Sequence, residues 1–90
     1  MAAKRAPGPS KATDKAAEEL HALVGINFRR ARLKANLTQA DVEQLTGIRQ
    51  HYISEIERGL LNLTLDTMSA LATVTGTDIR ALLRRPSKKG

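Results

Sequence analysis

The stretch Leu37-Thr-Gln-Ala-Asp-Val-Glu-Gln-Leu-Thr-Gly-Ile-Arg-Gln-His-Tyr-Ile-Ser-Glu-Ile-Glu-Arg-Gly59 decides the fold of this chain. Its first part predicts a short helix that begins after Thr38. The Thr38 hydroxyl can accept a hydrogen bond from an unpaired backbone N–H, and Asp41 brings a carboxylate to the positive end of the helix dipole. Val42 and Leu45 are then expected to face inward.

A second helix is predicted after Gly47, because glycine adopts the left-handed backbone conformation that ends one helix and turns into the next. Its apolar anchors are Ile48, Ile53 and Ile56. The face that they leave outward carries Arg49, Gln50, His51, Ser54, Glu55 and Arg58. Two short helices joined by a glycine turn are the outline of a helix-turn-helix, which places its second helix in the DNA major groove.

The flanking sequence predicts further helices and no strand. Residues 14–35 are rich in Ala, Glu, Leu, Arg and Lys, with Leu20, Val24, Phe28 and Ala31 at helical spacing. Gly25 is the weak point of this helix and could separate an added N-terminal segment from a core helix over 24–35. The later helices are expected over 39–46, 49–58, 65–75 and 78–84.

The last two of these helices have their own predicted caps and apolar stripes. Thr64 is expected to cap the fourth helix, and Thr77 the fifth. In the fourth helix the inward residues are expected to be Leu65, Met68, Leu71 and Ala72. In the fifth, Ile79, Leu82 and Leu83 form an apolar stripe that a small domain would struggle to cover alone. The fold class is therefore an all-α bundle of five helices.

Composition limits the classes of function. The formal net charge is +6, but residues 18–83 hold seven basic and eight acidic side chains, so the basic excess lies at the two ends. Residues 1–13 are expected to form a flexible basic arm, 14–85 the folded domain and 86–90 a basic tail.

The chain has no cysteine, which fits a reducing cytoplasm and excludes disulfides. No apolar run approaches the length of about 20 residues that spans a bilayer.

An enzyme is disfavoured. The two histidines, His21 and His51, are thirty positions apart, and the sequence has no glycine-rich phosphate loop and no cluster of carboxylates. No set of residues is thus suited to nucleophilic, acid–base or metal chemistry, and no cofactor is expected.

Several motifs together resemble the Cro/cI-type (XRE) family of phage and bacterial DNA-binding regulators. They are Leu37-Thr38-Gln39, Thr46-Gly47-Ile48, Tyr52-Ile53-Ser54-x-Ile56-Glu57-Arg58-Gly59 and Asn62-x-Thr64-Leu65. The Tyr-Ile-Ser and Asn-x-Thr-Leu elements are also similar to those of restriction–modification controller proteins. The resemblance covers residues 24–83 and implies a lambda-repressor-like bundle that binds double-stranded DNA.

The resemblance implies roles for the residues around the second helix. Gln50 matches a glutamine that reads adenine, the alternative being an exposed polar residue with no role. His51, Ser54 and Glu55 complete the reading face. Glu55 would accept from a cytosine amino group, or remain a solvated carboxylate. Gln39, Arg49, Tyr52 and Arg58 are the candidate phosphate contacts. Arg49 could instead meet a guanine edge, Tyr52 could be packing, and Gln39 could be an ordinary polar residue at a helix start.

One implied pair is structural, and two positions depart from the family pattern. Glu57 matches a glutamate that pairs with an arginine of the first helix, here Arg32. Glu43 stands where the family has a small residue between the two helices, which puts that packing in doubt. Leu60 and Leu61 replace basic residues that touch phosphates, so the loop could serve a protein partner at Leu60–Leu63.

We therefore predict a cytoplasmic, sequence-specific regulator of transcription that binds double-stranded DNA, with a homodimeric repressor on a two-fold operator as the expected form. Ile79, Leu82 and Leu83 are the expected dimer interface. The alternative is a protein-interaction module such as the antitoxin of a toxin–antitoxin pair. A co-purifying toxin would distinguish it, since fold alone does not settle function.

Overall fold

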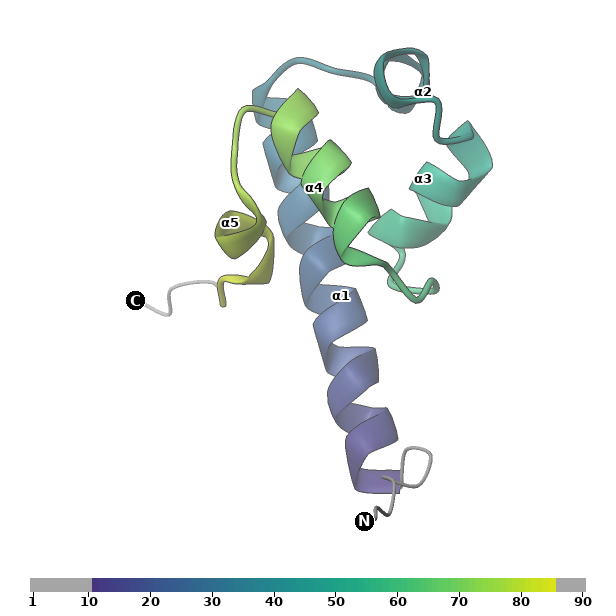
Figure 1. Ribbon diagram of the computed structural model, residues 1–90, viewed down its shortest axis with the longest axis vertical. Coiled ribbons are helices and arrows are strands. Elements are labelled where there is room, and N and C mark those ends of the chain that lie inside the picture. The colour runs from purple at the N-terminus through teal and green to yellow at the C-terminus, as the bar shows by residue number, and fades with distance from the viewer. Residues whose placement is uncertain (1–10, 86–90) are drawn as a thin grey trace, which may run out of the picture.

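The computed structural model describes residues 11–85, which form a bundle of five α-helices (Figure 1). The helices are α1 (Lys11–Lys34), α2 (Gln39–Thr46), α3 (Gln50–Glu57), α4 (Leu65–Val74) and α5 (Ile79–Leu83). No strand occurs in this part of the chain, so the predicted all-α class is confirmed. The predicted basic tail and residues 1–10 of the predicted arm lie outside the described residues.

α1 is the long central helix of the bundle. It packs against α3 and α5, while α2 contacts α3 and α4, and α4 contacts α5. The N-terminal part of α1 extends well beyond the other helices (Figure 1). It begins at Lys11, inside the stretch expected to be a flexible arm, and it is continuous through Gly25. The helix therefore has no break at Gly25.

Gly25 is needed for the close approach of α1 and α3. A Cβ added at this position would overlap the carbonyl oxygen of Ile56 and would lie 2.9 Å from that of Glu57. Only a residue without a side chain lets the two backbones come this close. A glycine that looks like a helix breaker in the sequence is thus a packing residue.

The core lies where α1, α2, α3, α4 and α5 face one another. Its fully or largely buried apolar residues are Val24, Phe28, Val42, Ile53, Ile56, Met68, Leu71, Ala72 and Leu82. Leu45 was expected to face inward and is 61% exposed, because α2 turns only its Val42 side toward the neighbouring helices. Leu65 is exposed at the first position of α4, and Leu20 is half exposed on the extended part of α1.

Local capping signals explain why the helices begin where they do. Thr38 and Asp41 form a complete capping box: Thr38 Oγ1 accepts from the Asp41 N–H at 2.9 Å, and Asp41 Oδ2 accepts from the Thr38 N–H at 2.8 Å. Gly47 has φ of 80°, the predicted left-handed conformation. α2 therefore has the predicted bounds.

The cap of α5 was assigned to the wrong residue. Asp78 caps this helix, because its Oδ1 accepts from the Ala81 N–H at 3.1 Å, whereas the Thr77 hydroxyl lies 3.2 Å from that of Thr75. The hydrogen bond from Ala81, aided by the Arg80 side chain, holds the pKa of Asp78 below its usual value.

Leu82 belongs to the core of the subunit. Its side chain is 0% exposed, so it cannot contact a partner as the sequence suggested. Ile79 is partly buried against the same core, and Leu83 remains exposed. The apolar stripe of α5 mainly fixes this short helix to the rest of the bundle.

Asn27 of α1 also fixes α5. Its Nδ2 donates to the carbonyl oxygens of Leu82, at 2.8 Å, and Arg84, at 2.7 Å. Carbonyls at the end of a helix have no partner within the helix, so these two bonds satisfy groups that would otherwise need water. A single amide thus ties the C-terminal end of α5 to α1.

We expect Asn27→Ala to lower the free energy of unfolding by about 1–3 kcal/mol, because it removes a partly buried hydrogen bond to the Leu82 carbonyl and an exposed one to the Arg84 carbonyl. Urea unfolding followed by circular dichroism would measure the change. Asn62→Ala, at an exposed position, is the matched control and should change the stability by less than about 0.5 kcal/mol. Equal losses in the two variants would contradict the role given to Asn27.

Candidate nucleic-acid interface

The turn at Gly47 and the burial of Ile53 and Ile56 fix which face of α3 is outward. Both isoleucines lie in the core, so the opposite face of this two-turn helix is presented to solvent. Arg49 is the N-cap and Arg58 the C-cap, one residue outside the observed helix at each end. Among the predicted contact residues, Arg49, Gln50, His51, Tyr52 and Arg58 are exposed, while Ser54 and Glu55 are partly exposed.

The structure brings the starts of α2 and α3 together. Gln39, the first residue of α2, and Gln50, the first residue of α3, line the same surface hollow of about 450 Å³. The loop from Asn36 to Thr38 forms its other side. Two amide side chains therefore border one hollow, an arrangement suited to hydrogen-bonding a phosphate or a base edge.

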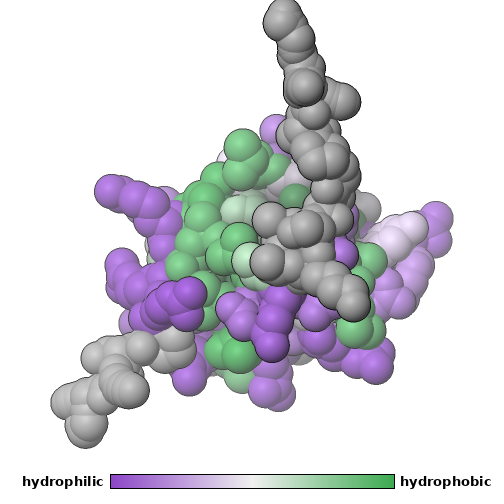
Figure 2. Space-filling view, turned by 90° about the horizontal axis from the view of Figure 1, so that it is seen from below, coloured by the Kyte–Doolittle hydropathy of each residue, from purple (hydrophilic) through white to green (hydrophobic). Residues whose placement is uncertain are grey.

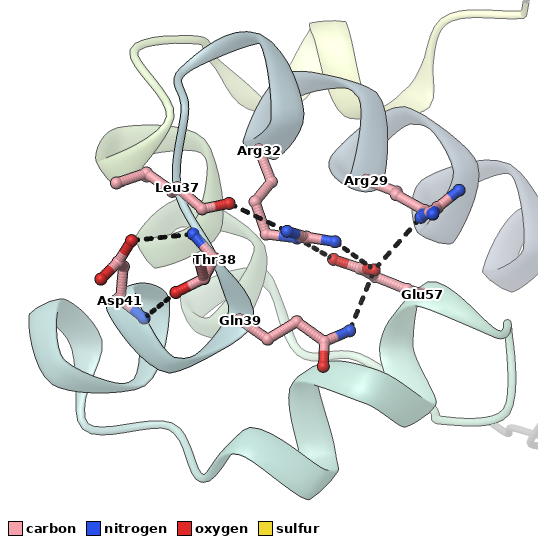
Figure 3. A network of polar contacts seen from close by, with 7 residues as sticks. All are labelled: Arg29, Arg32, Leu37, Thr38, Gln39, Asp41 and Glu57. Carbon is pink, nitrogen blue, oxygen red and sulfur yellow. Dashed lines mark hydrogen bonds and ion pairs between the residues drawn. The ribbon is translucent and has the colours of Figure 1, made fainter.

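A buried ion pair holds α3 to α1 (Figure 3). Arg32 Nε donates to Glu57 Oε2 at 2.6 Å, and Arg32 Nη2 donates to Glu57 Oε1 at 3.1 Å. The side chains of Arg32 and Glu57 are only 9% and 5% exposed. Arg32 Nη1 also donates to the Leu37 carbonyl oxygen at 2.9 Å, which fixes the loop before α2. The pair that the resemblance implied is thus present, in bidentate form.

The Glu57 carboxylate extends this contact to α2 and to the surface. Gln39 Nε2 donates to Glu57 Oε1 at 3.1 Å, and Arg29 Nε lies 3.8 Å from the same oxygen (Figure 3). Arg29 is largely exposed, so its outer nitrogens remain accessible to solvent. The Glu57 carboxylate, at the end of α3, therefore contacts side chains of both α1 and α2. These contacts fix the orientation of α3 relative to the other two helices.

His51 and Tyr52 form an aromatic pair on the outer part of α3. Their ring centroids are 4.3 Å apart, with the planes tilted by 30°. Tyr52 is half exposed, so it is both a packing partner of His51 and accessible to a ligand. The two alternatives suggested for Tyr52 are therefore compatible. Stacking narrows the range of orientations available to the His51 ring.

The two departures from the family pattern are accommodated differently. Glu43 is partly exposed, and α2 still packs against α3, so its carboxylate reaches solvent. Leu60 is exposed, but Leu61 and Leu63 pack partly against the core. The partner surface suggested at Leu60–Leu63 is thus reduced to the neighbourhood of Leu60.

Sequence reasoning missed two residues that position this interface. Gly25 admits the end of α3 to the surface of α1, and Asn27 anchors α5 on α1. A glycine in the middle of a helix of strong helix formers is a recognisable signal for close packing. The sequence contained no comparable signal for Asn27, because its partners are backbone carbonyls 55 and 57 positions away.

The sequence and the fold match those of known proteins. Residues 28–82 match the family model described as helix-turn-helix. The chain belongs to the helix-turn-helix family. This helix-turn-helix protein is 43% identical over 58 residues to an uncharacterized HTH-type transcriptional regulator of Sinorhizobium fredii, covering 64% of this chain and 75% of that relative. It is 31% identical over 71 residues to the control protein C.SmaI of Serratia marcescens, covering 79% and 84% of the two chains.

Two solved structures share the fold of this helix-turn-helix protein. The restriction-modification controller protein C.AhdI of Aeromonas hydrophila superposes with a TM-score of 0.65 at 29% identity, over 69% of this chain and 94% of that one. A hypothetical transcription factor from Neisseria superposes with a TM-score of 0.72 at 24% identity, over 91% and 87%. The family and its relatives make this a protein of the DNA-binding regulator class rather than an enzyme.

Two further observations concern only the described part of the chain. None of its helices is long and apolar enough to cross a membrane. Within the same residues, no three His, Cys, Asp or Glu side chains are grouped so that they could hold a metal ion.

Proposed function

We propose that this helix-turn-helix protein binds one DNA sequence specifically, as a homodimer on a two-fold operator, and regulates transcription from it in the cytoplasm. The observation that carries the proposal is the position of Gln50. It is exposed at the start of α3 beside Gln39, on a helix whose other end is held by the buried Glu57 carboxylate. A rigid helix with polar side chains at its N-terminal end is suited to the DNA major groove.

Within this proposal the outward residues of α3 divide into two groups. Gln50 offers an amide that can be bidentate to adenine N6 and N7, and Glu55 can accept from a cytosine amino group. His51 and Ser54 complete the base-reading group. Arg49 and Arg58 at the two ends of α3, together with Gln39 and Tyr52, contact phosphates and set the orientation of the helix.

Gln39 can bind the Glu57 carboxylate and a DNA phosphate at the same time. Its Nε2 donates one hydrogen to Glu57, and an amide nitrogen carries two. The second hydrogen is available to a phosphate oxygen. A phosphate bound there would be linked through Gln39 and Glu57 to the position of α3.

We expect Gln50→Ala to weaken binding to the cognate duplex by about 1–3 kcal/mol, and binding to random duplex by much less, because only base-edge hydrogen bonds distinguish the two. The cognate duplex would first be selected from a random pool. Fluorescence anisotropy at fixed salt concentration would then measure both affinities. The matched control is Gln44→Ala, which removes an exposed glutamine of α2 and should leave both affinities unchanged.

Two results would count against this assignment. An equal loss on cognate and random duplex would show that Gln50 contacts only the backbone. A protein that selects no sequence from the pool would contradict sequence-specific recognition as a whole.

A further inference from the structure

An apolar groove follows the N-terminal half of α1. It has a volume of about 500 Å³, and its lining includes Leu20, Leu23 and Ile26. Leu20 is 48% and Ile26 47% exposed, so within residues 14–85 nothing covers them fully. Viewed from the N-terminal end of α1, hydrophobic surface gathers on the side toward α5 (Figure 2). Isolated exposed leucines are ordinary, but a continuous apolar groove marks an interaction surface.

The groove lies mainly on the α5 side of α1, and its edge at Ala22 and Ile26 reaches the residues at the end of α3. Gly25 faces the end of α3, and Asn27 faces the end of α5. Two residues separated by two positions on an α-helix point about 200° apart, in nearly opposite directions. Leu20, Leu23 and Asn27 follow helical spacing, so the groove continues along the Asn27 side toward the end of α5. No residue of α3 lines the groove, and Gln50 lies at the end of α3 that is farther from Ala22 and Ile26.

The rim of the groove carries both signs of charge. Glu19 and Arg85 both line it, and their neighbours Glu18 and Arg84 repeat the same charges. All four side chains are exposed. The carboxylates lie on α1, and the guanidinium groups lie on the segment that follows α5. A surface with an apolar centre between opposite charges is complementary to a copy of itself turned by a two-fold axis.

We infer that this groove is the contact between two copies of the chain. The N-terminal half of α1 of one protomer lies in the groove of the other, with Leu20 and Ile26 at the centre and Glu19 of each protomer opposite the partner's Arg85. The inference rests on the proposed homodimer and names its surface. It moves the interface from the buried Leu82 to residues on either side of the stretch that matches the family model.

Sedimentation equilibrium at micromolar concentration would test the apolar centre. We expect Leu20→Glu and Ile26→Glu each to weaken self-association at least tenfold, since a carboxylate would be buried in the contact. Leu65→Glu, at a leucine outside the groove that is 69% exposed, should change self-association less than twofold. Circular dichroism melting of each variant shows whether it remains folded. Variants that are folded and still dimerise like the original chain would overturn the inference.

A charge exchange tests the orientation. Glu19→Arg alone and Arg85→Glu alone should each weaken the homodimer, because like charges then face each other twice. Mixing the two variants should restore dimers, since every facing pair in the mixed dimer is again of opposite sign. If Glu19 and Arg85 instead paired within one protomer, mixing the variants would not restore the pair. The absence of mixed dimers would therefore overturn the proposed orientation.

Two other results would also overturn the inference. The original chain could stay monomeric, and deletion of residues 1–10 could then make it dimerise; in that case the chain's own N-terminus occupies the groove. A chain that remains monomeric with or without these residues contradicts the contact directly. Neither result bears on the Gln50 test, which reports sequence-specific binding on its own.

Discussion

Glu57→Ala should lower the free energy of unfolding by about 3–5 kcal/mol, because it leaves the guanidinium of Arg32 buried without its counter-charge. Total stabilities of small domains are about 5–15 kcal/mol, so this loss is a large fraction of the total. The loss exceeds that of one hydrogen bond, since Glu57 also accepts from Gln39 of α2. Urea unfolding followed by circular dichroism would measure it.

The chain provides its own control for this prediction. Arg80 and Asp78 form an ion pair at 3.2 Å, but their side chains are 90% and 60% exposed. Arg80→Ala should change the stability by less than about 1 kcal/mol, because water screens exposed pairs. Comparable losses in Glu57→Ala and Arg80→Ala would show that burial of the Arg32–Glu57 pair adds nothing.

A double substitution separates the pair from its surroundings. Replacing both partners by apolar residues, as in Arg32→Met with Glu57→Leu, removes the stranded charge and should recover much of the loss of Glu57→Ala. The Gln39 amide and the Leu37 carbonyl would still lack their partners. We therefore expect a folded protein whose α3 is less firmly held. Its affinity for cognate duplex should fall even where its stability recovers.

Features that depend on residues close together in the sequence could be predicted, whereas features that depend on distant residues mostly could not. Thr38, Asp41 and Gly47 interact within a few residues, and α2 was predicted with its observed bounds. The cap of α5 was missed because Thr77 and Asp78 are adjacent and both can cap a helix. The choice depends on where the preceding turn places them.

Tertiary partners were harder to predict. Helical periodicity predicted that Leu45 faces inward and that Leu82 is available to a partner. In the structure Leu45 is exposed and Leu82 is fully buried. The Arg32–Glu57 pair joins residues 25 positions apart, and only the family resemblance pointed to it. The outward face of α3 was predicted from the sequence, because the isoleucine spacing of a single helix defines its opposite side.

Gly25→Ala should also cost about 3 kcal/mol or more of stability, although alanine is the better helix former. Helix propensity alone would favour alanine over glycine by about 1 kcal/mol. The new Cβ, however, meets the backbone carbonyls of Ile56 and Glu57, and a backbone cannot move aside as a flexible side chain can. Overpacking costs are typically about 1–3 kcal/mol and rise where relief requires a shift of the main chain.

The position of this collision makes it a test of function as well as of packing. The displaced carbonyls belong to the last turn of α3, next to the carboxylate that joins α1, α2 and α3. Gly47→Ala is the control: its φ of 80° strains an alanine, but no atom lies within 4 Å of the new Cβ. It should cost about 1–2 kcal/mol, the penalty of the left-handed conformation alone. A larger loss in Gly47→Ala than in Gly25→Ala, measured by thermal unfolding, would mean that α1 and α3 can separate without penalty and that Gly25 does not set their distance.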